Sequence, residues 1–580
     1  MPFSDRGSRL MVFQTPHKSE LFIKLAERLT FIDSNLEAYL QRPPFISNLV
    51  LLDEAGEGLD FKMTAYPHML YLTTRLGDFC VAFKDNHTIA FGIPPGITAG
   101  ISFQVSPRIW QVLESGGQIK SVRDFTYVTN SRVVRNHIRS EDGGYNVELV
   151  VEADDDATIA ISIGSDRQLP KSIEPFSSIL ESSQERWQGW FKRVPPVAEH
   201  FRRTYAYAWW VMANNLVKPK GTIYYEAMMP SKSHYVGLWL WDSAMHALAY
   251  RHLDPELARN QIRAMIACQL PDGMLPDAIY DEGVVSQIDH PILAEVTKPP
   301  ILSWAVLKLH ETSPDLAFLQ EVYIPLVRCN AWWFSMNDDD VDGLSQYNHP
   351  YSSGLDDNPL WDYGMPVESP DINTYLCIQM NSLARMAELL GMDAEAAMWQ
   401  RRAKAIVNRM IEDFWDETAG VFYATREDEP IPVVTPFNLY PLWTGQLPNE
   451  MANRLIAHLC DPNEFWTDYG IPSVARNDPH FNPEQMWRGP VWVNINYFFI
   501  EALQLAGRAD LARTLRKRTL DLIMSSPGMY EYYNADSGKP GARAAEAFGW
   551  TAAVFIDLAI AASREEEPTL ALPPAGAEKG

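Results

Sequence analysis

The pattern of apolar and polar residues divides the chain into two parts. Up to about residue 185, short runs that are apolar, or that alternate between apolar and polar residues, are separated by Gly, Pro, Asn and Asp. Runs of this length and period are typical of antiparallel strands, so we predict a β-rich accessory domain over residues 1–185. One amphipathic segment, at residues 20–40, interrupts the strand pattern.

In the second part of the chain, apolar residues recur at helical spacing. We count about eleven or twelve such segments between residues 195 and 563, alternately apolar-rich and charged. Concentric inner and outer helices would produce this alternation, so we predict an all-α (α/α)6 toroid over residues 186–563. A superhelix of repeats is the alternative, although no fixed repeat period is visible. Residues 564–580 are predicted to be a disordered tail.

Composition and charge exclude several classes of function. The net charge of −25 and the pI near 4.9 oppose binding to nucleic acid or to an anionic membrane. Five scattered cysteines indicate neither disulfides nor a zinc site, and no apolar run has the length of a signal peptide or a membrane helix. We therefore expect a cytoplasmic protein whose partner is a small neutral or cationic molecule. The sequence leaves the oligomeric state open.

The aromatic content is the feature of the composition that points to a ligand. The chain has 18 Trp and 24 Tyr, and flat aromatic faces stack on the C–H faces of sugar rings. Aromatic packing between helices is the alternative explanation. The connections between the predicted helices favour the sugar site, because six of them gather Trp, Asp, Glu, Gln, Arg and Asn. These segments are 237–246, 268–283, 338–362, 485–497, 528–538 and 548–554.

Taken in order and spacing, the six segments resemble glycoside hydrolase family 63, which comprises inverting α-glucosidases and their mannosylglycerate and glucosylglycerate hydrolase relatives. The resemblance covers roughly residues 200–563, and the β-rich part is similar to the accessory domain of longer bacterial members. It implies that Asp356, in Ser353-Gly354-Leu355-Asp356, is the general acid. It also implies that Glu531, in the sequence EYYNADSG, is the general base.

The resemblance further implies a set of sugar contacts in the same domain. These fall on Trp241, Asp242, Gln269, Asp272, Gly273, Trp487, Arg488, Trp492, Asn494 and Trp550. One position departs from the family pattern, because Ser352 stands where members commonly have Glu. This departure leaves a supporting contact and the exact substrate open.

Structural roles compete with the functional ones at several of these positions. Asp and Asn side chains often close turns or cap helices, and buried Arg and Trp often belong to the core. The competing roles are an Asx turn for Asp356, a surface position for Glu531, a helix cap for Asp242, an ion pair for Arg488, and core packing for Trp492 and Trp550. We assign Asp357 and Asp362 to the turn and to groups that support the site.

Metal and nucleotide cofactors are not expected. Asp338, Asp340, Asp342 and Gly343 match the start of a calcium loop, but its twelfth position is His349 instead of a bidentate Glu. A structural calcium ion is therefore kept only as an alternative. No zinc-binding His pair and no Gly-rich nucleotide loop are present in the sequence.

These observations predict an inverting, exo-acting glycoside hydrolase that releases glucose from a small α-glucoside. The first alternative is a glucosylglycerate or mannosylglycerate hydrolase. Such a substrate carries a carboxylate and needs a cation near the aglycone, for which Arg488 is the candidate. Two alternatives come from other classes: a non-catalytic carbohydrate-binding protein on the same toroid, and an epimerase or lyase that would use His or Tyr for proton transfer.

Overall fold

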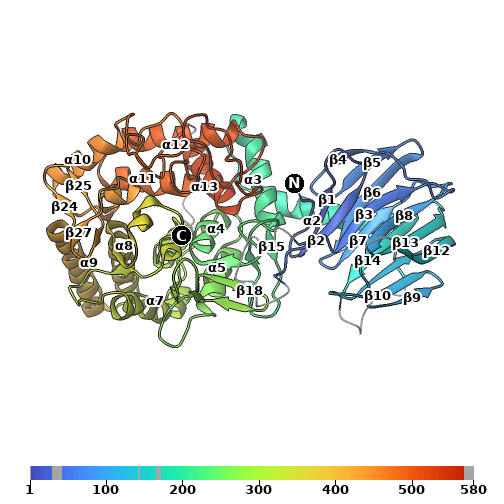
Figure 1. The fold of residues 1–580 in the computed structure, drawn as a ribbon, viewed down its shortest axis with the longest axis horizontal. Coiled ribbons are helices and arrows are strands. Elements are labelled where there is room, and N and C mark those ends of the chain that lie inside the picture. The colour runs from blue at the N-terminus through green and yellow to red at the C-terminus, as the bar shows by residue number, and fades with distance from the viewer. Residues whose placement is uncertain (1, 29–41, 142–143, 165–171, 567–580) are drawn as a thin grey trace, which may run out of the picture. The chain divides into compact units, whose positions relative to one another are not determined.

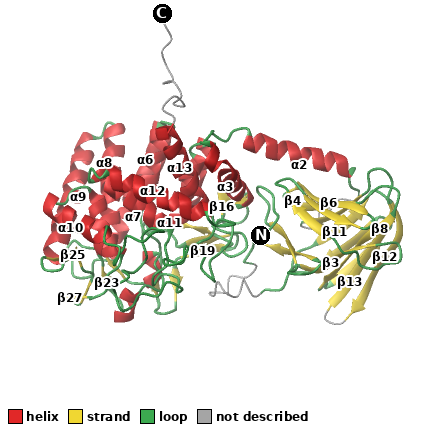
Figure 2. Cartoon of the chain, turned by 90° about the horizontal axis from the view of Figure 1, so that it is seen from above, coloured by secondary structure: helices red, strands yellow, loops and turns green. Residues whose placement is uncertain are grey.

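The computed structural model describes residues 2–28, 42–141, 144–164 and 172–566 (Figures 1 and 2), and the chain forms two compact units. The first unit comprises residues 1–27, 35–194 and 213–218, and the second comprises residues 28–34, 195–212 and 219–580. A β-sheet region followed by a helical region was predicted, and this order is confirmed. The predicted boundaries at residues 185 and 563 stay predictions, and the predicted tail from residue 567 on lies outside the described residues.

The first unit is built from two antiparallel sheets that share one hydrophobic core (Figure 2). The six-stranded sheet has the order β1-β2-β3-β8-β13-β12, and the eight-stranded sheet has the order β4-β5-β6-β7-β14-β11-β10-β9. The strands of the first sheet are β1 (Leu10–Gln14), β2 (Leu21–Leu25), β3 (Ile46–Leu52), β8 (Thr98–Val105), β12 (Arg132–Glu141) and β13 (Gly144–Glu152). Those of the second are β4 (Lys62–Ala65), β5 (Leu70–Thr74), β6 (Gly77–Asp85), β7 (Thr88–Gly92), β9 (Ile109–Leu113), β10 (Gly116–Lys120), β11 (Phe125–Thr129) and β14 (Thr158–Ile163).

Strand periodicity explains how the second sheet buries both of its faces. On β6 and β7, Val81 and Phe91 face the shared core, while the alternate residues Ala82 and Ala90 pack beneath helix α2 (Phe176–Phe191). Part of the segment predicted to be amphipathic, residues 20–40, is strand β2. Its residues from 29 on lie outside the described part of the chain.

The second unit contains an inner set of buried helices. α4 contacts α6, and the contacts continue through α8, η4, α11 and α13 back to α4, so the cycle closes (Figure 1). These elements are α4 (Leu240–Tyr250), α6 (Leu302–Thr312), α8 (Pro370–Leu389), the 3-10 helix η4 (Pro436–Thr444), α11 (Val493–Leu505) and α13 (Gly549–Glu566). The fourth inner element is a short 3-10 helix because Pro441 lacks a backbone N–H and Gly445, with φ 65°, ends the helix.

An outer set of helices is buried on one face only. These helices are α3 (Arg202–Asn214), α5 (Pro255–Ile266), α7 (Leu316–Met336), α9 (Asp393–Asp413), α10 (Asn449–Leu459) and α12 (Ala509–Met524). The described residues from 195 to 566 thus hold the eleven α-helices α3 to α13, in agreement with the number expected from the sequence. No described helix is both long and apolar enough to cross a membrane.

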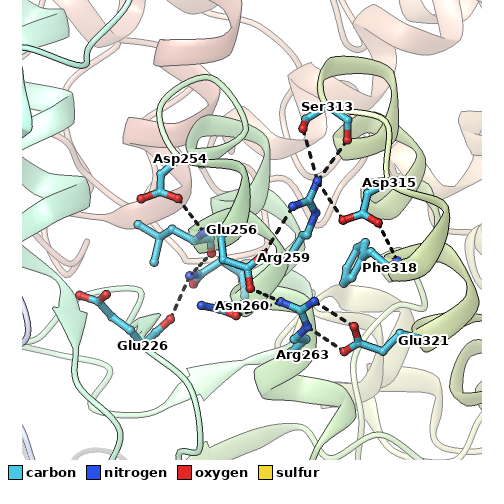
Figure 3. Close-up of polar contacts among 12 residues, drawn as sticks. Glu226, Asp254, Glu256, Arg259, Asn260, Arg263, Ser313, Asp315, Phe318 and Glu321 are labelled. Carbon is cyan, nitrogen blue, oxygen red and sulfur yellow. Dashed lines mark hydrogen bonds and ion pairs between the residues drawn. The ribbon is translucent and has the colours of Figure 1, made fainter.

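Local sequence sets the ends of the outer helices, as Figure 3 shows for α5 and α7. The Asp254 and Asp315 side chains accept backbone N–H groups of the first turns of α5 and α7, respectively. Arg263 on α5 pairs with Glu321 on α7 at 2.7 Å, and Arg259 pairs with Asp315 at 3.3 Å. Exposed ion pairs of this kind contribute about 1 kcal/mol or less each, so burial of the inner helices dominates the stability of this unit.

The buried carboxylate of Asp557 links α13 to α11 and to the C-terminal end of α4. Asp557 on α13 accepts hydrogen bonds from Arg251 and His252 at 2.7 Å and from Tyr497 at 2.8 Å. We expect Asp557→Ala to lower the free energy of unfolding by about 3–5 kcal/mol, because it leaves the Arg251 charge buried without its partner. Chemical denaturation monitored by circular dichroism measures the change. Asp510→Ala, which removes an exposed ion pair with Arg508, is the control and should cost less than about 1 kcal/mol.

Candidate functional site

A cavity of about 380 Å³, its open mouth included, lies in the second unit. Its wall comes from segments that precede or begin the inner helices α4, α6, α8, α11 and α13, and five of the six motif segments contribute to it. The lining residues are Pro230, Tyr235, Trp239, Trp241, Asp242, Lys298, Gly354, Asp356, Met486, Trp487, Trp492, Glu531, Phe548 and Trp550.

A tight turn brings Asp356 into the cavity wall. Gly354 ends a 3-10 turn with φ 78°, and a Cβ atom at this position would lie 2.4 Å from the Trp241 ring. Only glycine therefore allows the turn to pack against that ring. The Trp361 indole N–H also donates to the Leu355 carbonyl at 2.7 Å. Together these contacts hold the backbone of Gly354 and Leu355, directly before Asp356.

The environment of Asp356 favours a protonated carboxyl group. Desolvation by the surrounding protein raises its pKa to about 7, the Lys298 charge opposes this rise, and the charges of Asp277 and Asp357 add to it. The Asp356 side chain lines the cavity and is 32 % exposed. Asp356 can therefore hold a proton at neutral pH and give it to a bound molecule.

Glu531 lies in the wall of the same cavity with both carboxyl oxygens hydrogen-bonded. The Tyr235 hydroxyl donates to Oε1 at 2.6 Å, and the Ala545 backbone N–H donates to Oε2 at 3.0 Å. Burial raises the pKa of Glu531 to about 7, although both hydrogen bonds lower it, and the Asp356 charge raises it further. Two carboxyl groups with near-neutral pKa values thus influence each other, so ionisation of one favours protonation of the other.

A buried ion pair lies next to Asp356. Lys298 Nζ is 3.0 Å from Asp277 Oδ1 and 3.5 Å from Asp356 Oδ1, and it donates to the Tyr351 carbonyl at 2.5 Å. Burial alone would lower the pKa of Lys298, but the charges of Asp277 and Asp356 outweigh it and raise the pKa above its usual value. Lys298 therefore stays charged.

Two of these residues, Lys298 and Tyr235, were not predicted from the sequence. Lys298 belongs to the connection that precedes α6, and Tyr235 to the one that precedes α4. The motif segments also lie in or next to such connections. The location of Lys298 and Tyr235 in connections before inner helices was therefore the signal that could have revealed both residues.

Five of the predicted sugar contacts line the cavity: Trp241, Asp242, Trp487, Trp492 and Trp550. The Trp487 and Trp492 rings stack at 3.4 Å between centroids, and Trp241 meets Trp550 edge to face at 5.3 Å. Burial raises the pKa of Asp242 well above its usual value, against the opposing charge of Lys298. The wall thus combines large aromatic faces with carboxyl groups, as a sugar site requires.

The other predicted contacts lie outside the lining, and their contact with a sugar stays a prediction. The Gln269 side-chain amide donates to the Gly273 and Pro325 carbonyls at 2.8 Å, and Asp272 accepts the Met274 N–H at 3.0 Å. These residues therefore stabilise a turn. The two remaining positions are Asn494, which is fully buried in the first turn of α11, and Arg488, whose guanidinium forms two hydrogen bonds with Asp362.

Neighbouring groups support the Asp356 turn. Asp357 accepts the Trp487 backbone N–H at 2.8 Å, as expected for a residue assigned to supporting contacts. Ser352, the position that departs from the family pattern, accepts the Thr297 N–H at 3.2 Å and so links the turn to the segment that carries Lys298.

The acidic loop with Asp338, Asp340 and Asp342 contributes no residue to the described lining of the cavity. Ligand atoms of Asp338, Asp340 and Asp342 lie within 4.8 Å of one another, and Arg409 pairs with Asp342 at 2.8 Å. His349, at the twelfth position, accepts the Tyr351 N–H through Nδ1. Calcium binding by this loop stays a prediction.

Comparison with known proteins gives one matching family. The model of the mannosylglycerate hydrolase MGH1-like glycoside hydrolase domain matches residues 235–551, which is more than half of the chain. A mannosylglycerate hydrolase of Thermus thermophilus is 27% identical over 399 residues, which cover 57% of this chain and 95% of the relative.

Among the solved structures that are similar to this chain, two illustrate the likeness. The crystal structure of a GH63 mannosylglycerate hydrolase from Thermus thermophilus in complex with glucose superposes with a TM-score of 0.53 at 25% identity. That match covers 61% of this chain and 99% of the other. A bacterial glucoamylase in complex with acarbose has a TM-score of 0.60 at 11% identity, and the match covers 97% of this chain and 94% of the other. The second likeness concerns the fold alone.

Proposed function

Because this chain belongs to the MGH1-like glycoside hydrolases of family 63, we propose that it is an inverting, exo-acting hydrolase that releases glucose from a small α-glucoside. The observation that carries the proposal is the pair Asp356 and Glu531, which line one cavity with pKa values raised to about 7. We also infer that the closed cycle of inner helices, with the outer helices around it, is an (α/α)6 toroid.

In the proposed reaction, the two carboxyl groups act on opposite faces of the sugar. Asp356 donates its proton to the glycosidic oxygen, so that the aglycone leaves as a neutral alcohol. Glu531 accepts a proton from a water molecule that attacks the anomeric carbon from the other side, which inverts the configuration. The hydrogen bond from Tyr235 and that from the Ala545 N–H orient the Glu531 carboxylate for this step.

The aromatic wall would hold the glucosyl residue. Trp241, Trp487, Trp492 and Trp550 offer apolar faces to the sugar ring, and Asp242 offers acceptors to its hydroxyl groups. All proton transfers use side chains of the protein and water, so we propose that the reaction needs no cofactor. We also propose a cytoplasmic location and a small-molecule substrate, without a nucleic acid or membrane partner.

The lining argues for hydrolysis over the alternatives from other classes. An epimerase or lyase would use a His or Tyr facing Asp356, but the described lining residues include no His, and Tyr235 is hydrogen-bonded to Glu531. A binding protein has no need of two carboxyl groups with raised pKa values in one cavity.

Proton NMR of freshly formed products tests the proposal. A panel of α-linked glucose disaccharides and glucosylglycerate is incubated with the protein, and the anomeric signals are followed before mutarotation. We expect β-glucose to appear first from at least one panel member. Release of α-glucose would show retention, and absence of turnover for the whole panel would contradict hydrolysis.

The pH dependence of Tyr235→Phe tests how Glu531 is tuned. The Tyr235 hydroxyl lowers the pKa of Glu531 by donating to its charged form, so its removal raises that pKa. Because the base must be ionised, the acidic limb of kcat/KM should move to higher pH by about one unit. An acidic limb that stays in place, or that moves to lower pH, would contradict this role of the hydroxyl.

A further inference from the structure

We propose that the cavity is selective for uncharged glucosides and rejects those whose aglycone carries a carboxylate. Glycerate glycosides, on which the Thermus relative acts by its name, belong to the rejected class. The inference rests on the proposed function, because it names the substrate class of the same site. It follows from the charges in the lining and from what each of them already binds.

Carboxyl groups outnumber cations in the wall. Among the described lining residues, Asp242, Asp356 and Glu531 carry carboxyl groups, whereas Lys298 is the single cation. Asp277 lies behind Lys298 and adds a further negative charge next to it. A carboxylate that entered this cavity would therefore lose its hydration and meet the ionised Glu531, while Asp277 already opposes the positive charge of Lys298.

Lys298 is held by oxygen atoms of the protein itself. A lysine ammonium group has three N–H donors. Three oxygen atoms surround Lys298 Nζ: the Tyr351 carbonyl at 2.5 Å, Asp277 Oδ1 at 3.0 Å and Asp356 Oδ1 at 3.5 Å. Its charge is paired with that of Asp277, so Lys298 serves the wall of the site and attracts an anion only weakly.

Arg488 was the cation expected from the sequence to meet a carboxylate, but Asp362 already binds its two Nη atoms. Nη1 donates to Asp362 Oδ2 at 2.8 Å and Nη2 donates to Asp362 Oδ1 at 2.5 Å, and the residue lies outside the lining.

Hydroxyl groups, by contrast, find partners in this wall. Carboxylate oxygens accept O–H donors, and the protonated Asp356 can donate to an oxygen. A polyol or a second sugar as the aglycone keeps these contacts and adds no charge. Selectivity then arises because the uncharged group is solvated by the site and the carboxylate is not.

A matched pair of compounds tests the inference. 2-O-α-Glucosylglycerol and 2-O-α-glucosylglycerate share the linkage and the carbon skeleton, and they differ only in a hydroxymethyl group against a carboxylate. We expect kcat/KM for the uncharged compound to exceed that for the anion at least about tenfold at pH 7, and the dissociation constants from calorimetry to follow the same order. Equal values, or a preference for the anion, would overturn the inference.

A variant shows whether Lys298 sets this preference. Asp277→Asn removes the charge that is paired with Lys298 at 3.0 Å, so the preference for the uncharged compound should fall at least about fivefold. Asp510→Asn makes the same chemical change in an exposed ion pair on α12 and should leave the preference within about twofold of the wild type. An unchanged preference in Asp277→Asn would contradict the role of Lys298. The wild-type comparison decides the selectivity even where this variant does not fold.

The dissociation constants from calorimetry distinguish a failure of the selectivity from a failure of the proposed function. If no α-glucoside is hydrolysed but the uncharged compound binds more tightly, the proposed function fails and the selectivity stands. If other α-glucosides are hydrolysed and the anion binds as well as the uncharged compound, the selectivity fails and the hydrolase stands. If neither compound binds, the selectivity is overturned.

Discussion

Asp356→Asn is expected to lower kcat for hydrolysis of an α-linked glucose disaccharide by about 10²–10⁴-fold. Asparagine keeps the size of the side chain and its place in the turn, but it has no acidic proton to give to the leaving oxygen. A stopped assay of glucose release measures the loss. Circular dichroism checks that the variant keeps the wild-type fold, so that the loss reports chemistry.

A comparison of substrates with different leaving groups tests the role of Asp356 more directly than the decrease in kcat alone. Fluoride leaves without protonation, so α-glucosyl fluoride should be hydrolysed by Asp356→Asn with a much smaller defect than the disaccharide. Asp357→Asn is the matched control, because this neighbouring carboxylate accepts only supporting hydrogen bonds from Trp487 and Gln485. We expect it to retain kcat within about tenfold. An equal defect of Asp356→Asn on both substrates would contradict its assignment as the acid.

Glu531→Gln is expected to lower kcat by about 10²–10⁴-fold on the disaccharide and on α-glucosyl fluoride alike. Glutamine can still accept the Tyr235 hydrogen bond, but it cannot take a proton from the attacking water. Both substrates need that water, so both lose activity, in contrast to Asp356→Asn. Initial rates of glucose release from the two substrates give the comparison.

Glu484→Gln is the control for Glu531→Gln. Glu484 is exposed and accepts a hydrogen bond from Asn534, so Glu484→Gln changes a glutamate outside the lining. We expect it to keep kcat within about threefold of the wild type. If Glu531→Gln hydrolysed the fluoride at the wild-type rate, Glu531 would not be the base.

The resemblance of six sequence segments to glycoside hydrolase family 63 pointed to parts of the site. It implied roles for Asp356 and Glu531, and the structure places both in one cavity with Trp241, Trp487 and Trp492. Such motifs can be recognised along the chain because they consist of neighbouring residues. Arg488 was predicted to contact the sugar, but it lies outside the described lining. The sequence could not exclude this contact, since an arginine suits both an ion pair and a sugar contact.

The tertiary structure added partners that no local pattern shows. Lys298 reaches Asp356 across 58 positions of the sequence, and Tyr235 reaches Glu531 across 296. Neither contact has a sequence signature, because each depends on which connections the inner helices bring to the same end of the unit. The pKa values of both carboxyl groups follow from these contacts and from burial, so only the folded chain sets them.

By itself, the sequence determined the β-rich first part and the helical second part, and its resemblance to the family pointed to Asp356 and Glu531. Periodic burial and capping act between residues a few positions apart, so they can be recognised along the chain. The tertiary structure alone decided which elements form the cycle of inner helices, that η4 takes one of the inner places, and that Lys298 and Arg488 are already paired with aspartates. These features arise from long-range packing and from charge pairing in a buried environment, whose energies depend on distances that only the folded protein defines.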